Sequence, residues 1–161
     1  MAELNNLLAE ISSARLYEEV LKMSLGGGAL LTFEALRRYK LFQTLFPVTE
    51  LESDQRQCDF RETFVGQALA DTDRRIAESK SVTPAFILAV LLWNSVNREC
   101  ERLTKKGMAP ADAMSVAGDR FLSQQVNRIA VPRRVTQITR EIWAMQLGFS
   151  KRSPRRARRV V

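Results

Sequence analysis

The chain has 161 residues, of which 45% are hydrophobic, and it carries 25 Lys and Arg against 18 Asp and Glu, a net charge of +7. The absence of His excludes Ser-His-Asp and Cys-His catalysis and every metal site with His ligands. The longest apolar run, 85–93, is about half of what a membrane span needs. We therefore expect one domain, or one domain and a fragment, in a cytoplasmic protein without a membrane-spanning segment.

Two helical regions are expected in the first third of the chain. Apolar residues at helical spacing predict a first helix over 4–11 and then 16–23, which the glycines at 26–28 end. A second helix is expected over 30–45, and Pro47 ends it. The residues expected to face the core from this second helix are Phe33, Leu36 and Phe42.

The middle of the chain combines a polar loop, over 50–59, with two further helices. The first follows the loop, and its apolar positions are Phe60, Phe64, Ala68 and Leu69. Thr83 and Pro84 are of the types preferred at the N-cap and the first position of a helix, so they begin the second. That helix is expected to end at residues 105–107, two lysines and a glycine. Its apolar run 85–93 predicts that it is the most buried helix.

Prolines mark the starts of the remaining helices. Pro110 and Pro132 each begin a predicted helix, and the second of these ends at Gly148. Ser153 and Pro154 are expected to begin a short arginine-rich helix. No segment alternates apolar and polar residues over a strand's length. The predicted fold class is therefore all-α, a multi-helix bundle of antiparallel helices with an arginine-rich C-terminal helix.

The positive charge is concentrated at the C-terminal end. The first 127 residues carry 15 basic and 17 acidic groups, whereas the last 34 carry ten basic groups and one acid, Glu141. Nine of those ten cations are Arg, whose planar fork of donors fits phosphate oxygens. Like charges at this density repel one another, so a polyanionic partner is expected. A plain solvated surface and an acidic protein or membrane surface remain alternatives.

The predicted helix after Pro132 has two different faces. The residues that share its basic face are Arg133, Gln137, Arg140 and Ala144. The residues of its opposing apolar stripe are Val135, Ile138, Ile142 and Met145. This pattern favours a helix that packs by one face and presents cations on the other.

Three other features of the sequence predict no catalytic or metal-binding site. The glycines at 26–28 match no phosphate-loop pattern and are interpreted as a turn between helices. Asp71 and Asp73 resemble a magnesium-binding pair, but on a helix they point apart, so a solvated charged helix end is expected. Cys58 and Cys100 are expected to be reduced and to pack in the core. No catalytic residue or metal ligand is assigned.

Three stretches, 14–22, 32–47 and 131–143 with its continuation to Arg159, resemble the C-terminal, RNA-binding part of bacterial poly(A) polymerases, relatives of the tRNA CCA-adding enzymes. In the first stretch, the residues that match the family's neck-helix motif are Arg15, Glu19 and Lys22. The resemblance implies neck-like helices over 1–48, a helical body over 49–130 and a basic RNA-binding arm over 131–161, together one compact helical unit.

The resemblance also implies a function in RNA polyadenylation. These helices would hold the 3′ end of single-stranded RNA for template-independent addition of adenylate from ATP. The residues expected to bind RNA are Arg133, Arg134, Arg140, Lys151, Arg152, Arg155, Arg156, Arg158 and Arg159. The family's catalytic head, a nucleotidyltransferase domain that binds ATP and Mg²⁺, is not among these 161 residues, so we expect no cofactor here and no adenylation by these residues alone.

A protein-interaction module is the alternative. Its helices would dock the family's catalytic head or an RNA-decay protein, with Arg15 and Glu19 at the junction. These two residues are first interpreted as an ion pair four residues apart on one helix. Tyr39 is also noted, because it lies among Arg37, Arg38 and Lys40, where an aromatic ring can stack on a base.

Overall fold

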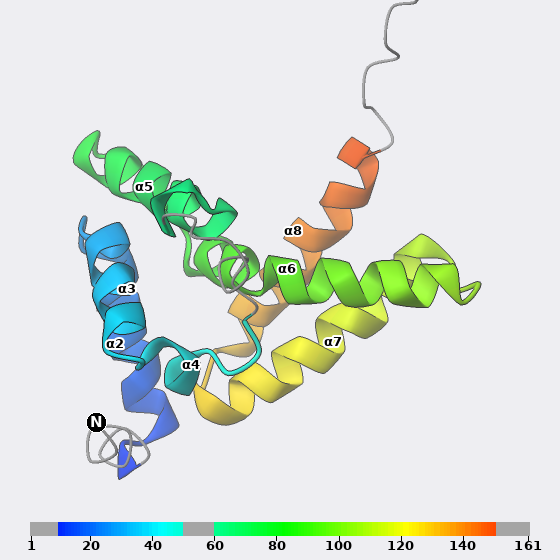
Figure 1. The fold of residues 1–161 in the computed structure, drawn as a ribbon, viewed down its shortest axis with the longest axis horizontal. Helices are drawn as coiled ribbons and strands as arrows, with labels where there is room; N and C mark the ends of the chain where they lie inside the picture. Colours follow the sequence, from blue (N-terminus) through cyan, green and yellow to red (C-terminus); the bar gives the residue numbers. More distant parts are fainter. Residues whose placement is uncertain (1–9, 50–59, 151–161) are drawn as a thin grey trace, which may run out of the picture.

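The computed structural model describes residues 10–49 and 60–150, and the regular elements in these ranges are all helical (Figure 1). The elements are α2 (Ser13–Leu25), α3 (Ala29–Arg38), α4 (Phe42–Leu45), the 3-10 turn η2 (Phe60–Glu62), α5 (Phe64–Ala77), α6 (Pro84–Lys105), α7 (Pro110–Arg128) and α8 (Arg133–Ser150). The all-α prediction is confirmed. The predictions for 4–9, 50–59 and the arginine-rich helix after Ser153 lie outside the described residues.

A glycine turn joins α2 to α3 and reverses the chain. Gly27 has a φ of 84°, a left-handed conformation that glycine adopts without strain. At the start of α3, the backbone N–H groups of Ala29 and Leu30 donate to the carboxylate of Asp73, at 2.7 and 3.0 Å. An acid from α5 thus occupies the N-terminus of α3. The expectation of a solvated helix end was therefore wrong for Asp73, although Asp71 is exposed and pairs with Arg74.

The single helix predicted over 30–45 is interrupted, because α3 ends at Arg38. Lys40 has a φ of 57°, and the N–H of Leu41 donates to the carbonyl of Leu36 at 2.8 Å. In this hydrogen-bonding geometry, which ends many helices, the position that Lys40 occupies is usually a glycine. The reversal lets the short α4 fold back against α3, where three rings pack with centroids 5.3–5.9 Å apart. These rings belong to Phe33, Phe42 and Phe46.

The helix predicted to run through Phe60 is also divided, because η2 and α5 are separate elements. Thr63 lies between them and accepts a hydrogen bond from the N–H of Gly66 at 3.1 Å, which makes Thr63 the N-cap of α5. The buried Phe60 lies beneath the guanidinium of Arg37, whose carbon is 4.5 Å from the ring centroid. This contact joins α3 to the turn before α5.

The three long helices α6, α7 and α8 form the larger half of the fold (Figure 1). Thr83 caps α6 as predicted, and Gly107, with a φ of 98°, follows its end. Helix α7 runs back along α6, and α8 crosses both. From α7, the buried Gln125 donates to the carbonyl of Leu45 at 2.8 Å, which ties α7 to the short α4. None of the helices in the described ranges is long and apolar enough to cross a bilayer.

The apolar run at the start of α6 is buried as predicted, with two exceptions. Ala85 and the six residues from Ile87 to Leu92 are buried, whereas Phe86 is 38% exposed and Trp93 is half-buried. Further along the same helix, the free thiol of Cys100 is buried as expected, and burial raises its pKa. Cys58 lies outside the described residues.

Glu99 links α6 to α7 through two arginines. Its carboxylate accepts hydrogen bonds from Arg102, at 2.6 and 2.7 Å, and from Arg120, at 2.9 Å. The hydrogen bonds from Arg102, followed by the positive charges of both arginines, lower the pKa of Glu99 from about 4.5 to about 2. The carboxylate is therefore stabilised in the folded state.

This pKa shift predicts a dependence of stability on pH. A carboxyl group with a lowered folded-state pKa contributes fully above its unfolded pKa, and this contribution is lost as the pH falls towards the folded value. Glu99→Gln is therefore expected to reduce the free energy of unfolding at neutral pH and to flatten its decline between about pH 4.5 and 2. Urea unfolding across this range measures the slope, and an unchanged slope in the variant would contradict the prediction.

Candidate nucleic-acid interface

The predicted basic face of α8 is exposed, but its arginines differ in their surroundings. Arg133 and Arg134 begin the helix, and within the described residues no acidic side chain pairs with either. Arg140, two turns later, donates through Nε to Oδ1 of Asp119 at 2.6 Å. The other six predicted contacts lie outside the described residues; they are Lys151, Arg152, Arg155, Arg156, Arg158 and Arg159.

Arg133 and Arg140 line one groove between α7 and α8, with a volume of about 390 Å³. Ser123 and Asn127 supply exposed polar side chains from α7, and Thr136 lies between the two arginines on α8. Two guanidinium groups beside a hydroxyl and an amide can bind phosphate and ribose oxygens. Arg134 does not line this groove, so the structure brings together two of the three described arginines.

The ion pair of Arg140 restrains this arginine only weakly. The side chains of Arg140 and Asp119 are 42% and 57% exposed, and ion pairs at such positions contribute about 0–1 kcal/mol. A phosphate oxygen can therefore replace the carboxylate at small cost. The pairing was not expected, because Asp119 lies 21 residues earlier in the chain.

The apolar stripe predicted for α8 is rotated from its expected position. Met145 is 58% exposed, and the buried residues are instead Thr136, Thr139 and Trp143. Both threonine hydroxyls donate to carbonyl groups of their own helix, at 2.8 Å, so these polar side chains can be buried at little cost. The rest of the stripe is half-buried, namely Val135, Ile138 and Ile142.

The neck-motif residues lie on the exposed side of α2. Glu19 pairs with Lys22, three residues on, at 2.9 Å, and this interaction, followed by the more distant charge of Arg15, lowers the pKa of Glu19. The expected direct pair between Arg15 and Glu19 is therefore wrong. All three side chains are exposed to solvent and available to a partner.

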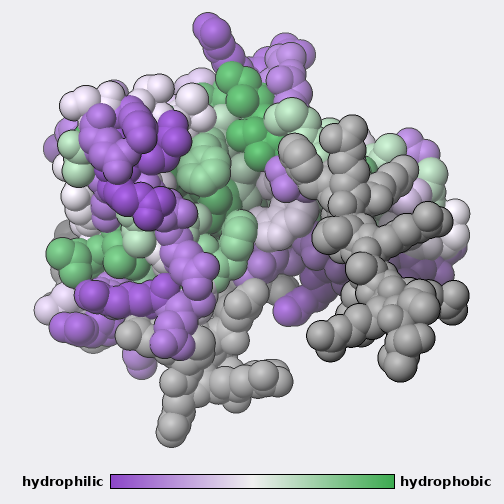
Figure 2. All heavy atoms as spheres, turned by 90° about the horizontal axis from the view of Figure 1, so that it is seen from above, coloured by the Kyte–Doolittle hydropathy of each residue, from purple (hydrophilic) through white to green (hydrophobic). Residues whose placement is uncertain are grey.

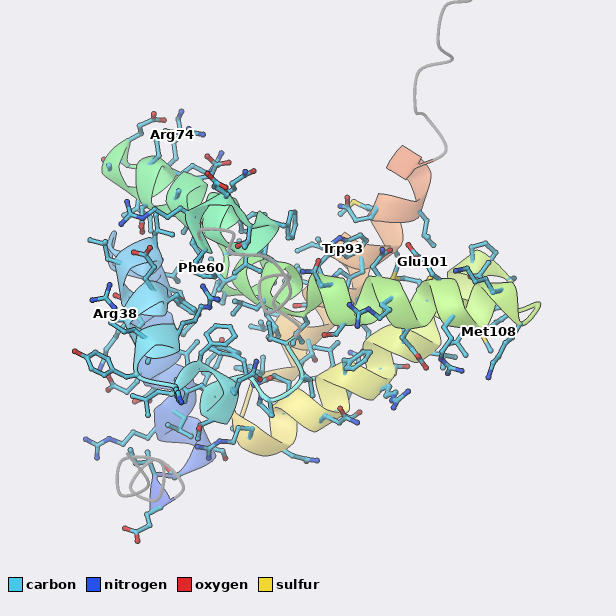
Figure 3. The ribbon with its side chains drawn as sticks, in the orientation of Figure 1. Arg38, Phe60, Arg74, Trp93, Glu101 and Met108 are labelled. Atoms are coloured by element: carbon cyan, nitrogen blue, oxygen red, sulfur yellow. The ribbon has the colours of Figure 1, made fainter. Side chains whose placement is uncertain are left out.

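A second exposed cluster lies at the end of α3. Tyr39 is 54% exposed and lies between the exposed Arg38 and Lys40, and Figure 3 shows Arg38 on the outer side of this helix. Arg37 is occupied by its contact with Phe60. The exposed tyrosine with two flanking cations can stack on a base and contact the adjoining phosphates.

Comparisons with known proteins agree with this distribution of charge. Residues 1–52 match a family model described as "Probable RNA and SrmB- binding site of polymerase A", and residues 106–161 match one described as "Polymerase A arginine-rich C-terminus". The two matched segments contain the Tyr39 cluster and the α7–α8 groove, respectively.

Curated relatives align over nearly the whole chain. Poly(A) polymerase I of Salmonella typhi is 36% identical over 155 residues, which are 96% of this chain and 33% of the relative. The Haemophilus influenzae enzyme of the same name is 36% identical over 94% of the chain and 34% of the relative, and that of Escherichia coli O157:H7 is 34% identical over 96% and 33%. The chain thus spans about a third of the length of these relatives. Both segment models and these alignments agree: nearly the whole chain is similar to the region of bacterial poly(A) polymerases that carries their probable RNA-binding and arginine-rich segments.

Proposed function

We propose that this chain binds single-stranded RNA without reading its sequence, and that it holds the RNA 3′ end for template-independent addition of adenylate. The observation that carries the proposal is the exposed Arg133 in the α7–α8 groove, which no acidic side chain in ranges 10–49 and 60–150 pairs with and which lies within the segment that matches the arginine-rich family model. Phosphate contacts suit an enzyme that must keep hold of a growing product, because they do not depend on the base. ATP and Mg²⁺ would be bound by the catalytic part of the polymerase.

The salt dependence of binding tests this proposal. If about six arginines contact phosphate, the logarithm of the affinity for an A20 oligomer should fall with the logarithm of the salt concentration at a slope near −4, from about −0.7 per contact. Arg133→Glu and Arg140→Glu should each weaken binding to A20 and U20 to the same extent and make the slope shallower.

Lys106→Glu provides the matched control for this experiment. It makes the same change of charge at the exposed end of α6, away from the groove. It should weaken binding much less than either groove variant. An affinity that does not respond to salt, no binding at all, or an equal effect of Lys106→Glu would contradict the proposal.

We further propose that the exposed side of α2 docks a protein partner, either the catalytic part of the polymerase or an RNA-decay protein. Support comes from the exposed, mixed charges of Arg15, Glu19 and Lys22 and from the family model that matches residues 1–52, whose description names SrmB beside RNA. Capture of a separately expressed catalytic part that survives nuclease and is lost in Glu19→Lys would support docking. Loss of capture after nuclease alone would contradict it.

A further inference from the structure

An apolar groove lies between α5, α6 and α8, apart from the α7–α8 groove and the Tyr39 cluster. Its volume is about 400 Å³, and Figure 2 shows it as a green hollow on one face of the molecule, with hydrophilic residues along one side. The aromatic and polar side chains that line it include Phe64, Gln67, Phe86, Trp93, Trp143 and Gln146. Figure 3 shows Trp93 on the side of α6 that faces α8.

Three of the four aromatic side chains that line this groove are open to solvent, and the fourth, Trp143, is buried. Phe64 is 44% exposed, Phe86 is 38% exposed and Trp93 is half-buried. Phe86 and Trp93 lie seven residues apart, and therefore on one face of α6. Exposed phenylalanines that line a common hollow form a contiguous apolar patch, and such patches on a protein surface indicate a binding site.

A charged hollow adjoins the groove at the far end of α5. Its volume is about 640 Å³, and it shares Asp71 and Phe86 with the apolar groove. It is lined by three cations, Arg74, Arg75 and Lys80, and by two acids, Asp71 and Glu78. The side chains of the pair Arg74–Asp71 are 66% and 58% exposed, so a phosphate can displace the acid cheaply.

We propose that the apolar groove stacks unpaired bases of an RNA strand, with the adjoining phosphates bound by Arg74, Arg75 and Lys80. The inference rests on the proposed RNA binding and assigns it a second subsite. Bases have apolar faces and polar edges, which match the phenyl rings of the groove and the amides of Gln67 and Gln146 at its rim. A partner helix would need a continuous apolar surface. The apolar surface of this groove instead ends at the hollow lined by cations, less than one helix length away.

Tryptophan fluorescence and RNA affinity together test the proposal in the full chain. Of the two tryptophans that line the groove, the half-buried Trp93 is accessible to a base, so A20 should quench part of the tryptophan emission. The double variant Phe64→Leu, Phe86→Leu removes two exposed rings and keeps apolar side chains, so the fold should be retained. We expect this variant to lose the quenching and to bind A20 about tenfold more weakly, with unchanged affinity for duplex RNA, whose bases cannot enter.

Val116→Ala is the matched control, because Val116 is a 47% exposed apolar residue on α7, outside the groove. Wild-type binding without quenching, together with wild-type affinity in the double variant, would overturn the subsite and leave the proposed function intact. Failure of the wild-type chain to bind any RNA would instead overturn the proposed function. If the double variant altered only the sedimentation of a self-associated form, the groove would be an interface between copies, and the proposal would be wrong.

Discussion

Trp143→Ala is expected to lower the free energy of unfolding by about 3–5 kcal/mol, the range for a large buried ring cut back to alanine. The indole is 1% exposed, and its Nε1 donates to the carbonyl of Ala89 on α6 at 3.1 Å. On its other side lies Gly118 of α7, where an added Cβ would be 3.1 Å from the ring. Three helices thus meet at this side chain. Urea unfolding, which gives both the midpoint and the slope, is the measurement.

Two further substitutions separate the causes of this effect. Trp143→Phe keeps most of the ring and loses the hydrogen bond, so it should cost about 1–3 kcal/mol. Met145→Ala changes an exposed side chain on the same helix and should stay within about 0.5 kcal/mol. A loss below 1 kcal/mol in Trp143→Ala would show that α8 does not depend on this indole for its position.

The long helices were predictable from the sequence because their ends are marked by local chemistry. Thr83 and Pro84 begin α6 and Gly107 follows it, as the sequence indicates. The break at Lys40 was missed for an equally local reason. Lysine rarely adopts a positive φ, so Lys40 gives no signal for a helix end. Tertiary packing of the phenylalanine cluster compensates for its strain.

The candidate interface was predictable only in part. The exposed face of α8, with Arg133 and Arg140, follows from helical periodicity alone. The polar side chains opposite them, Ser123 and Asn127, and the ion pair to Asp119 depend on how α7 packs against α8. Nothing in one sequence fixes that packing. The same limit explains the expected solvation of Asp73, which in the structure caps a helix more than forty residues earlier.

The open aromatic groove was not predicted for the same reason: one sequence does not fix how the helices pack. An aromatic residue at an apolar helical position is normally buried, and Trp143 fulfils that expectation. Phe86 and Trp93 occupy the same kind of position, but none of the described helices covers their side of α6. The angles at which α5 and α8 cross α6 decide which apolar positions remain exposed. These angles cannot be predicted from hydrophobic periodicity.

Gly66→Ala is expected to destabilise the protein by about 1–3 kcal/mol, although alanine is the better helix former. Gly66 is buried in the first turn of α5, against the preceding turn η2. A Cβ at this position would overlap the carbonyl oxygen of Phe60 and lie 2.9 Å from Cα of Arg61. Both are backbone atoms, so η2 would have to move, and the cap from Thr63 would be strained with it. Thermal or urea unfolding measures the loss.

Gly148→Ala distinguishes this steric effect from helix propensity. Gly148 lies in α8, and nothing in the described structure is within 4 Å of the position its Cβ would take. There the substitution should be neutral or should stabilise by up to about 1 kcal/mol, because alanine loses less conformational entropy in a helix than glycine. The two alanine variants should therefore change stability in opposite directions. Stabilisation by both would mean that α5 and η2 do not approach as closely as the structure places them, and the cap at Thr63 would lose its role in starting α5.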